Sequence, residues 1–382
     1  MRISIIANGF QEDYTINLIN ALAKDKYPID FLGSNIYQAS RIDPGITIYE
    51  IRKEDPSEKN PLRKGFWVAR YFYKYFIYLL QQKRNIIHIQ WLRFDFIDGV
   101  LFPLASKLMG HKVVYTAHDV VPHDDDTSLN RFIFKLIYRT QDHIVVHTNY
   151  IRERIIDEFH INPEKISVIK HGIYKLEKEP EINPGKYKKM LGINENEYVL
   201  LFLGIITGYK GLDLLADSLD LLKKETKIPV RLIVAGRVQK GFEEEMEYLK
   251  NERLTEGVDF YLRFIEEEEV NQLFGAADLT VLPYREASQS GVMFMSYTHG
   301  VPVIAPELGG FPDDIVEGEN GFLFKTHDEL SLKQMILKAN SKWGVNNRKI
   351  RRNITQLTSE KYRWEKSAED LIEIYKDLSV KN

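Results

Sequence analysis

The chain has 382 residues, of which 44% are hydrophobic and 28% are charged, with 23 Gly and 14 Pro. This length predicts two domains, and the composition excludes a collagen-like or disordered chain. The 52 basic and 55 acidic residues give a net charge of −3, which disfavours a general nucleic-acid binder. The chain contains no cysteine, so disulfides, thiolate catalysis and cysteine-based metal sites are excluded.

The first ten residues become polar too soon for a signal peptide, and no apolar run approaches the roughly 18 residues of a membrane span. We therefore expect a cytoplasmic protein that is soluble, or peripheral at the inner face of a membrane.

Short runs rich in β-branched residues alternate with amphipathic stretches in the N-terminal half. Strands are predicted at 2–7, 85–91, 112–117, 143–148 and 166–172, with helices at about 15–24, 62–83, 98–108, 129–139 and 150–159. Apolar strands separated by helices are typical of a parallel sheet covered on both faces. Residues 1–176 are therefore expected to form a doubly wound, Rossmann-like α/β domain.

The predicted helix at 62–83 has an unusual composition. Residues 62–84 include six basic, eight aromatic and no acidic side chains. A helix that packs on the sheet through its aromatic residues would have this pattern, and so would a helix that lies on an anionic membrane. Packing is the preferred interpretation, and membrane contact through the basic edge is the second.

The acidic triplet Asp124, Asp125 and Asp126 has two interpretations. Carboxylate clusters suit Mg²⁺, but acidic runs are usually solvated loop surface. We interpret the triplet as surface, and the ten histidines show no HExxH or similar ligand spacing.

The pattern is interrupted at 174–196, a charged segment with Pro180 and Pro184 whose start is predicted to be a linker. The alternation then resumes. Strands are predicted at 198–204, 229–236, 258–264, 278–284, 301–306 and 321–325, and helices at about 211–225, 241–253, 267–276, 290–299, 311–317 and 328–340. Residues 177–364 are thus expected to form a second Rossmann-like domain, followed by a last helix at about 365–378.

Two loops of the second domain carry the residues of most chemical interest. Ser288, Gln289, Ser290 and Gly291 lie at the start of an apolar helix, where free amide groups suit a diphosphate; on local evidence alone, ordinary helix capping is the preferred explanation. Lys210 follows the strand at 198–204 and would reach phosphates as a point charge, although a solvated lysine would look the same. Open α/β sheets bind ligands at the carboxyl ends of their strands, so we expect the site in a cleft between the domains.

The C-terminal segments together resemble a known family. These are GIITGYKGLDLL, VAG at 234–236, YLRFIEEEEVNQLFGAADLTVLPYREASQSGV, HGVPVIAPELGGFPDDIVEGENGFLF and RWEKSAEDLIEIYKDL. They are similar to the C-terminal half of glycosyltransferase family 4, which has the GT-B fold. HIQW, KVVYTAHDVVPH, VVHTNYIRERI and ISVIKHGI are similar to acceptor-domain segments of that family.

The resemblance implies retaining transfer of a hexosyl group from a UDP- or GDP-type nucleotide sugar to a hydroxyl of a glycan or lipid-linked acceptor. The product would be a surface polysaccharide or glycoconjugate. GT-B enzymes generally need no metal, so no cofactor is expected. The last helix, within 365–382, would return to the N-terminal acceptor domain.

Site residues follow from the same resemblance. His118 would lie near the reacting sugar, Lys210 would neutralise the leaving diphosphate, and Glu286 would orient the donor sugar. The nucleotide-sugar-binding residues would be Gly9, Phe10, Lys210, Ile265, Glu286, Ser288, Gln289, Ser290, Gly291, Val292 and Ser296. His123 would lie near the acceptor.

The chain departs from the family pattern in three places. Ser288 and Ser296 align with two common glutamates, and Ser296 would offer a ribose a hydroxyl in place of a carboxylate. Ile205 or Thr207 occupies the place of the usual arginine. Arg263 stands where glycine is frequent, either as a displaced positive charge or as a surface residue.

Two other functions fit parts of this pattern. A nucleotide-sugar epimerase would bind the same diphosphate but would need an acid/base set on the sugar. A non-enzymatic or catalytically weak donor-binding protein would explain the missing glutamate and arginine. A retaining glycosidase would need a pair of carboxylates, which the sequence does not show.

Overall fold

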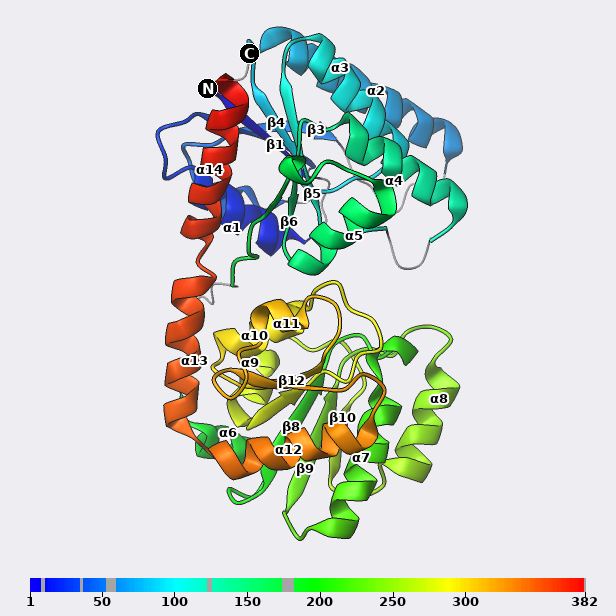
Figure 1. Ribbon diagram of the computed structural model, residues 1–382, viewed down its shortest axis with the longest axis vertical. Helices are drawn as coiled ribbons and strands as arrows, with labels where there is room; N and C mark the ends of the chain where they lie inside the picture. Colours follow the sequence, from blue (N-terminus) through cyan, green and yellow to red (C-terminus); the bar gives the residue numbers. More distant parts are fainter. Residues whose placement is uncertain (8–10, 35–36, 53–59, 122–125, 174–181, 381–382) are drawn as a thin grey trace. The chain divides into compact units, whose positions relative to one another are not determined.

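A computed structural model of the chain describes residues 1–7, 11–34, 37–52, 60–121, 126–173 and 182–380. The chain divides into two compact units, one of Met1–Gly172 with Tyr362–Asn382 and one of Ile173–Lys361. These boundaries lie within four residues of the expected ones. Each unit is built on one parallel sheet, which confirms the predicted pair of doubly wound α/β domains (Figure 1).

The sheet of unit 1 has seven parallel strands in the order β3-β2-β1-β4-β5-β6-β7. Its strands are β1 Ile3–Ile6, β2 Ile29–Ser34, β3 Thr47–Arg52, β4 Ile86–Ile89, β5 Lys112–Ala117, β6 His143–Val146 and β7 Ile166–Val168. Four-residue strands such as β1 and β4 are buried along their whole length, as expected of a sheet covered on both faces.

Helices cover both faces of this sheet (Figure 1). One face carries α1 Glu12–Leu22 and α14 Trp364–Val380, which share a core cluster with the sheet. The other face carries α2 Pro61–Gln81, the π-helical segment η2 Ile97–Leu101, α3 Phe102–Leu108, α4 Ser128–Thr140 and α5 Asn149–Phe159. The described part of the unit also contains two short 3-10 segments, η1 Ala39–Arg41 and η4 Pro163–Lys165.

The end of the chain is fixed to unit 1 by close packing and a hydrogen bond. A side chain at Gly172 would overlap the ring of Trp364, so glycine is required for the close approach. The Ser367 hydroxyl donates to the carbonyl of Lys170 at 2.9 Å. The last helix therefore belongs to the N-terminal domain, although it follows the C-terminal domain in sequence.

The sheet of unit 2 has six parallel strands in the order β10-β9-β8-β11-β12-β13. They are β8 Tyr198–Leu203, β9 Val230–Ala235, β10 Val258–Tyr261, β11 Leu279–Val281, β12 Val303–Pro306 and β13 Gly321–Phe324. The helical segments are α6 Pro184–Met190, η5 Gly208–Lys210, α7 Leu212–Glu225, α8 Glu243–Tyr248, η6 Leu249–Arg253, α9 Glu267–Ala276, α10 Gly291–Thr298, α11 Phe311–Asp314, α12 Glu329–Trp343 and α13 Arg348–Lys361.

Two buried cations hold the outer helices of unit 2 in place. Lys188 on α6 forms an ion pair with Asp278 at 2.7 Å, and the same carboxylate accepts from the amide of Val199 at 2.9 Å. Arg351 on α13 donates to main-chain carbonyls of Phe274, Gly275, Ala277 and His299. Burial lowers the pKa of Arg351 to about 10, which leaves the guanidinium charged at neutral pH.

Helix α2 confirms the preferred interpretation of the aromatic segment, because part of it packs on the sheet. Tyr71, Tyr75 and Tyr78 are buried, and the Tyr75 ring stacks on Phe102 of α3 at 4.0 Å between centroids. The Tyr78 hydroxyl donates to Asp30 at 2.6 Å. The opposite side of α2 is exposed.

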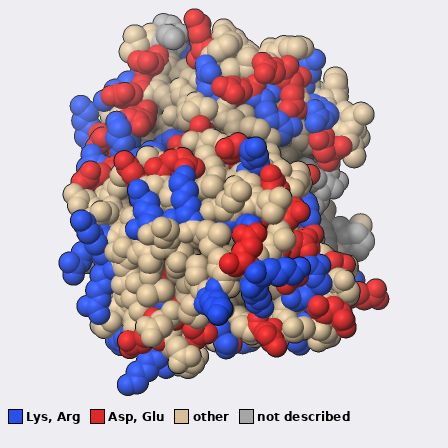
Figure 2. Space-filling model, turned by 60° about the horizontal axis from the view of Figure 1, so that its bottom comes forward, with Lys and Arg blue, Asp and Glu red and all other residues tan. Residues whose placement is uncertain are grey.

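Within the described residues, none of the helices has the length and apolar character needed to cross a membrane. On the face drawn in Figure 2, Lys and Arg side chains are interspersed with Asp and Glu, consistent with the small net charge.

Candidate functional site

The strand order of unit 2 reverses between β8 and β11, which are neighbours in the sheet. After β8 the chain continues to β9 and β10 on one side of this point, and after β11 it continues to β12 and β13 on the other side. Crevices at such switch points are where open α/β sheets bind ligands. Lys210 lies in the loop after β8, and residues 284–291 follow β11, so the two predicted loops flank the switch point.

Lys210 is held by an aromatic side chain in place of a carboxylate. Its Nζ donates to the hydroxyl of Tyr284 at 2.8 Å and lies 4.3 Å from the centroid of the same ring. Among the described residues, no Asp or Glu lies within ion-pair distance of this ammonium. Burial lowers the pKa of Lys210 from its usual value, because the charge is partly removed from water without a counter-ion. An anion placed here would supply the missing partner.

The hydroxyl of Tyr284 connects the lysine to the start of α10. Burial raises the pKa of the Tyr284 phenol well above its usual range, and a hydrogen bond with Ser290 acts in the opposite direction. Ser290 is the N-cap of α10 and accepts from the amide of Met293. The predicted helix start is therefore correct, and Lys210, Tyr284 and Ser290 form one connected group.

The loop before α10 is tightly packed. Ser288 and Ser290 are buried, and the amide nitrogen Nε2 of Gln289 is buried without a hydrogen-bond partner among the described residues. Gly291 begins the helix and is exposed. A buried amide without a partner is costly, and an acceptor atom of a ligand would satisfy it.

Glycines allow the site loops to touch through their backbones. Gly211 has φ +70°, and a side chain there would overlap the carbonyl of Pro283. Gly309 has φ +59°, and a side chain there would overlap the carbonyl of Ala287. The loops after β8, β11 and β12 are consequently packed into one rigid group.

An ion pair also joins two of these loops. Arg285, in the loop after β11, pairs with Asp213 at the start of α7 at 2.5 Å. Its main-chain amide donates to the carbonyl of Tyr209 at 2.7 Å. Arg285 is thereby occupied in positioning the loop that carries Lys210, a role that the sequence analysis did not recognise.

The remaining predicted donor-binding residues of unit 2 differ in exposure. Glu286 is exposed in the loop between Arg285 and Ser288, whereas Val292 and Ile265 are partly buried against the core. Ser296 requires a correction. It is fully buried, bonded to Thr280 at 2.7 Å and to the carbonyl of Val301 at 2.9 Å, so its hydroxyl serves the core and is not presented to a ribose.

Arg263 forms an ion pair with Glu269 at the start of α9. This agrees with the surface interpretation and leaves no displaced charge for a diphosphate. Of the two residues aligned with the missing arginine, Ile205 is exposed and Thr207 is buried.

In unit 1, His118 follows β5 and belongs to a cluster of rings at the carboxyl ends of the strands. It stacks on Trp91, which follows β4, with 3.6 Å between centroids and 7° between planes. Tyr14 meets the His118 ring edge-on at 5.0 Å. The Nε2 atom of His118 is buried without a hydrogen-bond partner among the described residues.

Burial lowers the pKa of His118 well below its usual value, and the neighbouring His147 and His171 act in the same direction. His118 is therefore a neutral imidazole at pH 7. With one ring nitrogen unsatisfied, it can donate a hydrogen bond to a hydroxyl or accept one from it, depending on the tautomer.

Several predicted residues lie outside the described part of the chain. Gly9 and Phe10 are among them, and so are His123, Asp124 and Asp125. Asp126 is described and pairs with Arg131 at 2.6 Å, as a surface carboxylate does. In the described ranges, no group of three or more His, Asp or Glu side chains could hold a metal ion.

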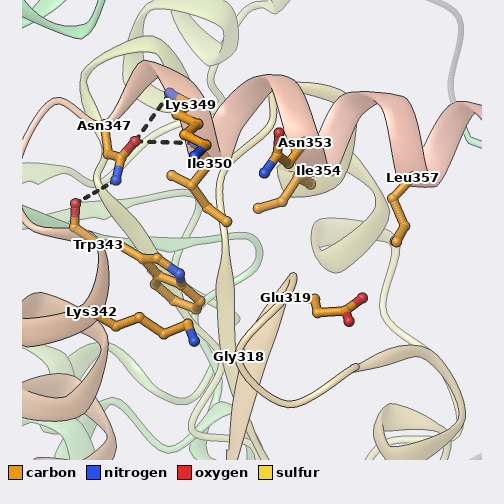
Figure 3. A pocket seen from close by; sticks show the side chains of 10 residues that line it. All are labelled: Gly318, Glu319, Lys342, Trp343, Asn347, Lys349, Ile350, Asn353, Ile354 and Leu357. Carbon is orange, nitrogen blue, oxygen red and sulfur yellow. Dashed lines mark hydrogen bonds between the residues drawn. The ribbon is translucent and has the colours of Figure 1, made fainter.

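A pocket of about 630 Å³ lies elsewhere in unit 2, between the end of α12, helix α13 and the turn at 318–319 (Figure 3). Asn347 on its wall donates to the carbonyl of Trp343 at 2.7 Å and accepts from the amide of Lys349 at 3.0 Å. These bonds connect the two helices. None of the residues that line the pocket belongs to the loops that follow the strands.

Comparison with known families gives two matches. The family described as glycosyl transferases group 1 matches residues 185–356, and Glycosyltransferase Family 4 matches residues 11–174. Together these matches include most of both units.

Similar curated proteins include a D-inositol 3-phosphate glycosyltransferase of Corynebacterium diphtheriae. It is 24% identical over 248 residues, which are 63% of this chain and 57% of the relative. An uncharacterized glycosyltransferase of Methanocaldococcus jannaschii is 24% identical over 65% of this chain and 62% of its own length. The chain thus matches less than two thirds of the length of these relatives.

Similar solved structures cover the whole chain. Anabaena Alr3699/HepE in complex with UDP has a TM-score of 0.74 at 17% identity and covers 99% of this chain and 100% of its own. Sucrose-phosphate synthase from Thermosynechococcus elongatus has a TM-score of 0.73 at 16% identity, with 100% of both chains covered. HepE has also been crystallised with UDP-glucose. At such identities the likeness shows the fold.

Proposed function

Because the chain belongs to the family 4-like glycosyltransferases of GT-B fold, we propose that it moves a hexosyl group from a nucleotide sugar to an acceptor hydroxyl with retention of anomeric configuration. The proposed donor is of the UDP or GDP type. The proposed acceptor is a glycan or a lipid-linked sugar of a surface polysaccharide or glycoconjugate.

The observation that carries this proposal is the ammonium of Lys210 at the switch point, which is partly buried and has no carboxylate partner among the described residues. When a nucleotide sugar reacts, the bond between the anomeric carbon and the diphosphate oxygen breaks, and negative charge develops on the diphosphate. A fixed cation and amide groups at a helix start stabilise that charge in the transition state. The bound UDP and UDP-glucose of HepE support a donor of this class.

Five residues have roles in this proposal. Lys210 neutralises the leaving diphosphate, and the start of α10 with Gln289 and Ser290 binds its oxygens. Glu286 orients the donor sugar. His118, neutral and with one ring nitrogen that has no partner among the described residues, hydrogen-bonds a hydroxyl of the transferred sugar.

The acceptor hydroxyl must lose a proton as it attacks the anomeric carbon. The resemblance implies that the departing diphosphate takes this proton, so the protein needs no general base of its own. The proposal includes no metal, because Lys210 and the helix start would stabilise the developing charge.

The direct test is to incubate the protein with UDP-glucose, UDP-galactose and GDP-mannose, with and without glycan acceptors, and to analyse the products by NMR. An α-linked product from an α-linked donor supports the proposal. A sugar epimer formed without acceptor would indicate the epimerase, and donor binding without any turnover would indicate a binding protein.

Glu286 is tested separately with Glu286→Gln, which keeps the shape of the side chain and removes its charge. Because Glu286 is exposed in its loop, the variant should fold normally. We expect a lower kcat with little change in donor affinity, and an unchanged kcat would reject the orienting role.

A further inference from the structure

Helix α2 has a second apolar side that does not pack on the sheet. Its exposed apolar residues are spaced by four and three residues in turn: Leu62, Phe66, Ala69, Tyr73, Phe76 and Leu80. This spacing places them on one stripe of the helix. Leu62 is 83% exposed and Leu80 is 60% exposed, so the stripe is uncovered along its whole length.

Two neighbouring helical segments expose apolar rows as well. Leu101, Leu104 and Leu108 do so on η2 and α3, and Leu108 is 90% exposed. Leu129 and Phe132 do so on α4. These segments cover the same face of the first sheet as α2 (Figure 1). We name the three rows on α2, α3 with η2, and α4 together the docking face.

The concentration of these residues is unusual. Of 23 exposed large hydrophobic side chains among the described residues, 12 lie between Leu62 and Phe132. Single exposed apolar residues are normal on a soluble protein, but a grouping of this kind marks an interaction surface.

The charges beside the docking face are basic. Arg70 is exposed next to the α2 stripe, Lys83 and Arg84 are exposed just after the helix, and Arg139 is exposed in the last turn of α4. None of these four forms an ion pair with a described residue. Residues 62–84 contain no acid, so the α2 part of the docking face contributes cations and no carboxylates of its own.

We propose that the docking face binds the surface of an anionic lipid bilayer. Apolar side chains would enter the boundary between headgroups and acyl chains, while Arg70, Lys83 and Arg139 would contact lipid phosphates. A second copy of the chain is a poorer occupant, because pairing two α2 helices would bring cations of one sign together. The inference does not depend on the proposed sugar transfer.

The experiment measures co-sedimentation of the full chain with vesicles of phosphatidylcholine alone, or with about one third phosphatidylglycerol. We expect binding to the anionic vesicles that weakens as salt is raised, and much weaker binding to the neutral ones.

Three pairs of substitutions test the apolar rows of the docking face and the cations beside it. Phe66→Gln with Phe76→Gln changes α2, and Leu108→Gln with Leu129→Gln changes α3 and α4. Each pair should lower the lipid partition coefficient about tenfold, the factor expected for losing partial burial of two large apolar side chains. Arg70→Gln with Lys83→Gln should lower it about twentyfold on anionic vesicles only.

The matched control is Tyr248→Gln with Leu330→Gln, which removes two exposed apolar side chains from unit 2 and should leave lipid binding unchanged. All substituted residues are exposed, and melting curves verify that each variant is folded.

Absence of binding to anionic vesicles would overturn the proposal, and so would equal binding by the variants and the wild type. A concentration-dependent dimer that the α2 variants abolish, without lipid binding by the wild type, would assign the face to a second copy. Loss of lipid binding with retained sugar transfer to a soluble acceptor would separate the two proposals.

Discussion

At the scale of single residues, the arrangement of Lys210 and Tyr284 is the most informative feature of the chain. The ammonium donates to the Tyr284 hydroxyl at 2.8 Å and lies over the same ring. A cation held by a neutral partner keeps its full charge for a ligand, whereas a carboxylate partner would compete with a diphosphate. Tyr284 is therefore a positioning residue for Lys210.

Tyr284→Phe tests this role. It keeps the ring beneath the ammonium but removes the hydroxyl that joins Lys210 to Ser290. Since a hydrogen bond of this kind contributes about 1 kcal/mol, we expect the donor Kd to rise about fivefold. Titration calorimetry with the nucleotide sugar measures the change, and Tyr248→Phe on the exposed side of α8 is the control. Identical affinities for Tyr284→Phe and the wild type would contradict the positioning role.

The sequence could identify Lys210 and Ser290, because a lysine after a strand and a serine before an apolar helix are local signals. It could not identify Tyr284, Trp91 or Arg285 as their supports. Those contacts join segments far apart in the chain, and no local pattern encodes them. Ser296 was assigned to the ligand by alignment alone, whereas the fold directs its side chain to the core.

At the scale of elements, the start of α10 can combine capping with the proposed binding of a diphosphate. Ser290 satisfies an amide of its own helix, which leaves other amides of the first turn available for an anion. The two interpretations of this turn are therefore compatible, and a stability measurement alone cannot separate them.

Ser290→Ala and Asp328→Ala form a matched pair. Each removes a side-chain N-cap in unit 2, from α10 and α12 respectively. Both should lower the free energy of unfolding by about 0.5–2 kcal/mol, seen as lower melting temperatures. We expect only Ser290→Ala to weaken donor binding. Equal donor affinity in the two variants would show that the α10 start does not contact the donor.

The histidines at the strand ends of unit 1 make its stability depend on pH. Burial lowers the pKa of His147 to about 4, and burial, followed by the charge of His147, lowers that of His171 to about 3. Unfolded histidines take up protons below about pH 6.5. Between about pH 6.5 and 4 the unfolded chain thus binds more protons, and the unfolding free energy falls as the pH falls.

Each such histidine contributes a slope of at most about 1.4 kcal/mol per pH unit in this window. Urea titrations at pH 7 and pH 5 measure the effect through tryptophan fluorescence, since Trp67, Trp91 and Trp364 belong to unit 1. We expect His147→Gln to reduce the slope of the unfolding free energy against pH by up to about 1.4 kcal/mol per pH unit, the contribution of one proton. The exposed control His327→Gln should leave this slope unchanged. A pH-independent unfolding midpoint between pH 7 and 5 would contradict this account.

Most strands and helices could be predicted from the sequence, because buried β-branched runs and amphipathic spacing are local. Strands β2 and β3 were not predicted. Among the described residues between them, the helical structure is a single 3-10 turn, and most of β3 is exposed, so the sequence had no amphipathic helix between the two strands and no apolar run at β3. Helix α13 was also missed, because it is strongly polar and its position depends on Arg351 and on the buried Ile354.

At the scale of the whole molecule, two units of the same architecture carry different side chains at their strand ends and on their surfaces. Unit 2 carries a cation and a helix start at its switch point, which suits a diphosphate. Unit 1 carries neutral rings at its strand ends and an exposed apolar face with basic neighbours. Under the proposals made above, the donor therefore binds to unit 2, and the acceptor and any lipid surface bind to unit 1.

The central claim is that Lys210 binds the diphosphate of a nucleotide sugar, and calorimetric titration of UDP- and GDP-sugars tests it most directly. Lys210→Met is compared with Lys224→Met, which removes an exposed lysine from the last turn of α7. We expect Lys224→Met to bind as the wild type does and Lys210→Met to bind about ten- to hundredfold more weakly, the loss typical of a hydrogen bond to a charged group. Equal affinity in both variants, or no binding of any donor by the wild type, would contradict the account.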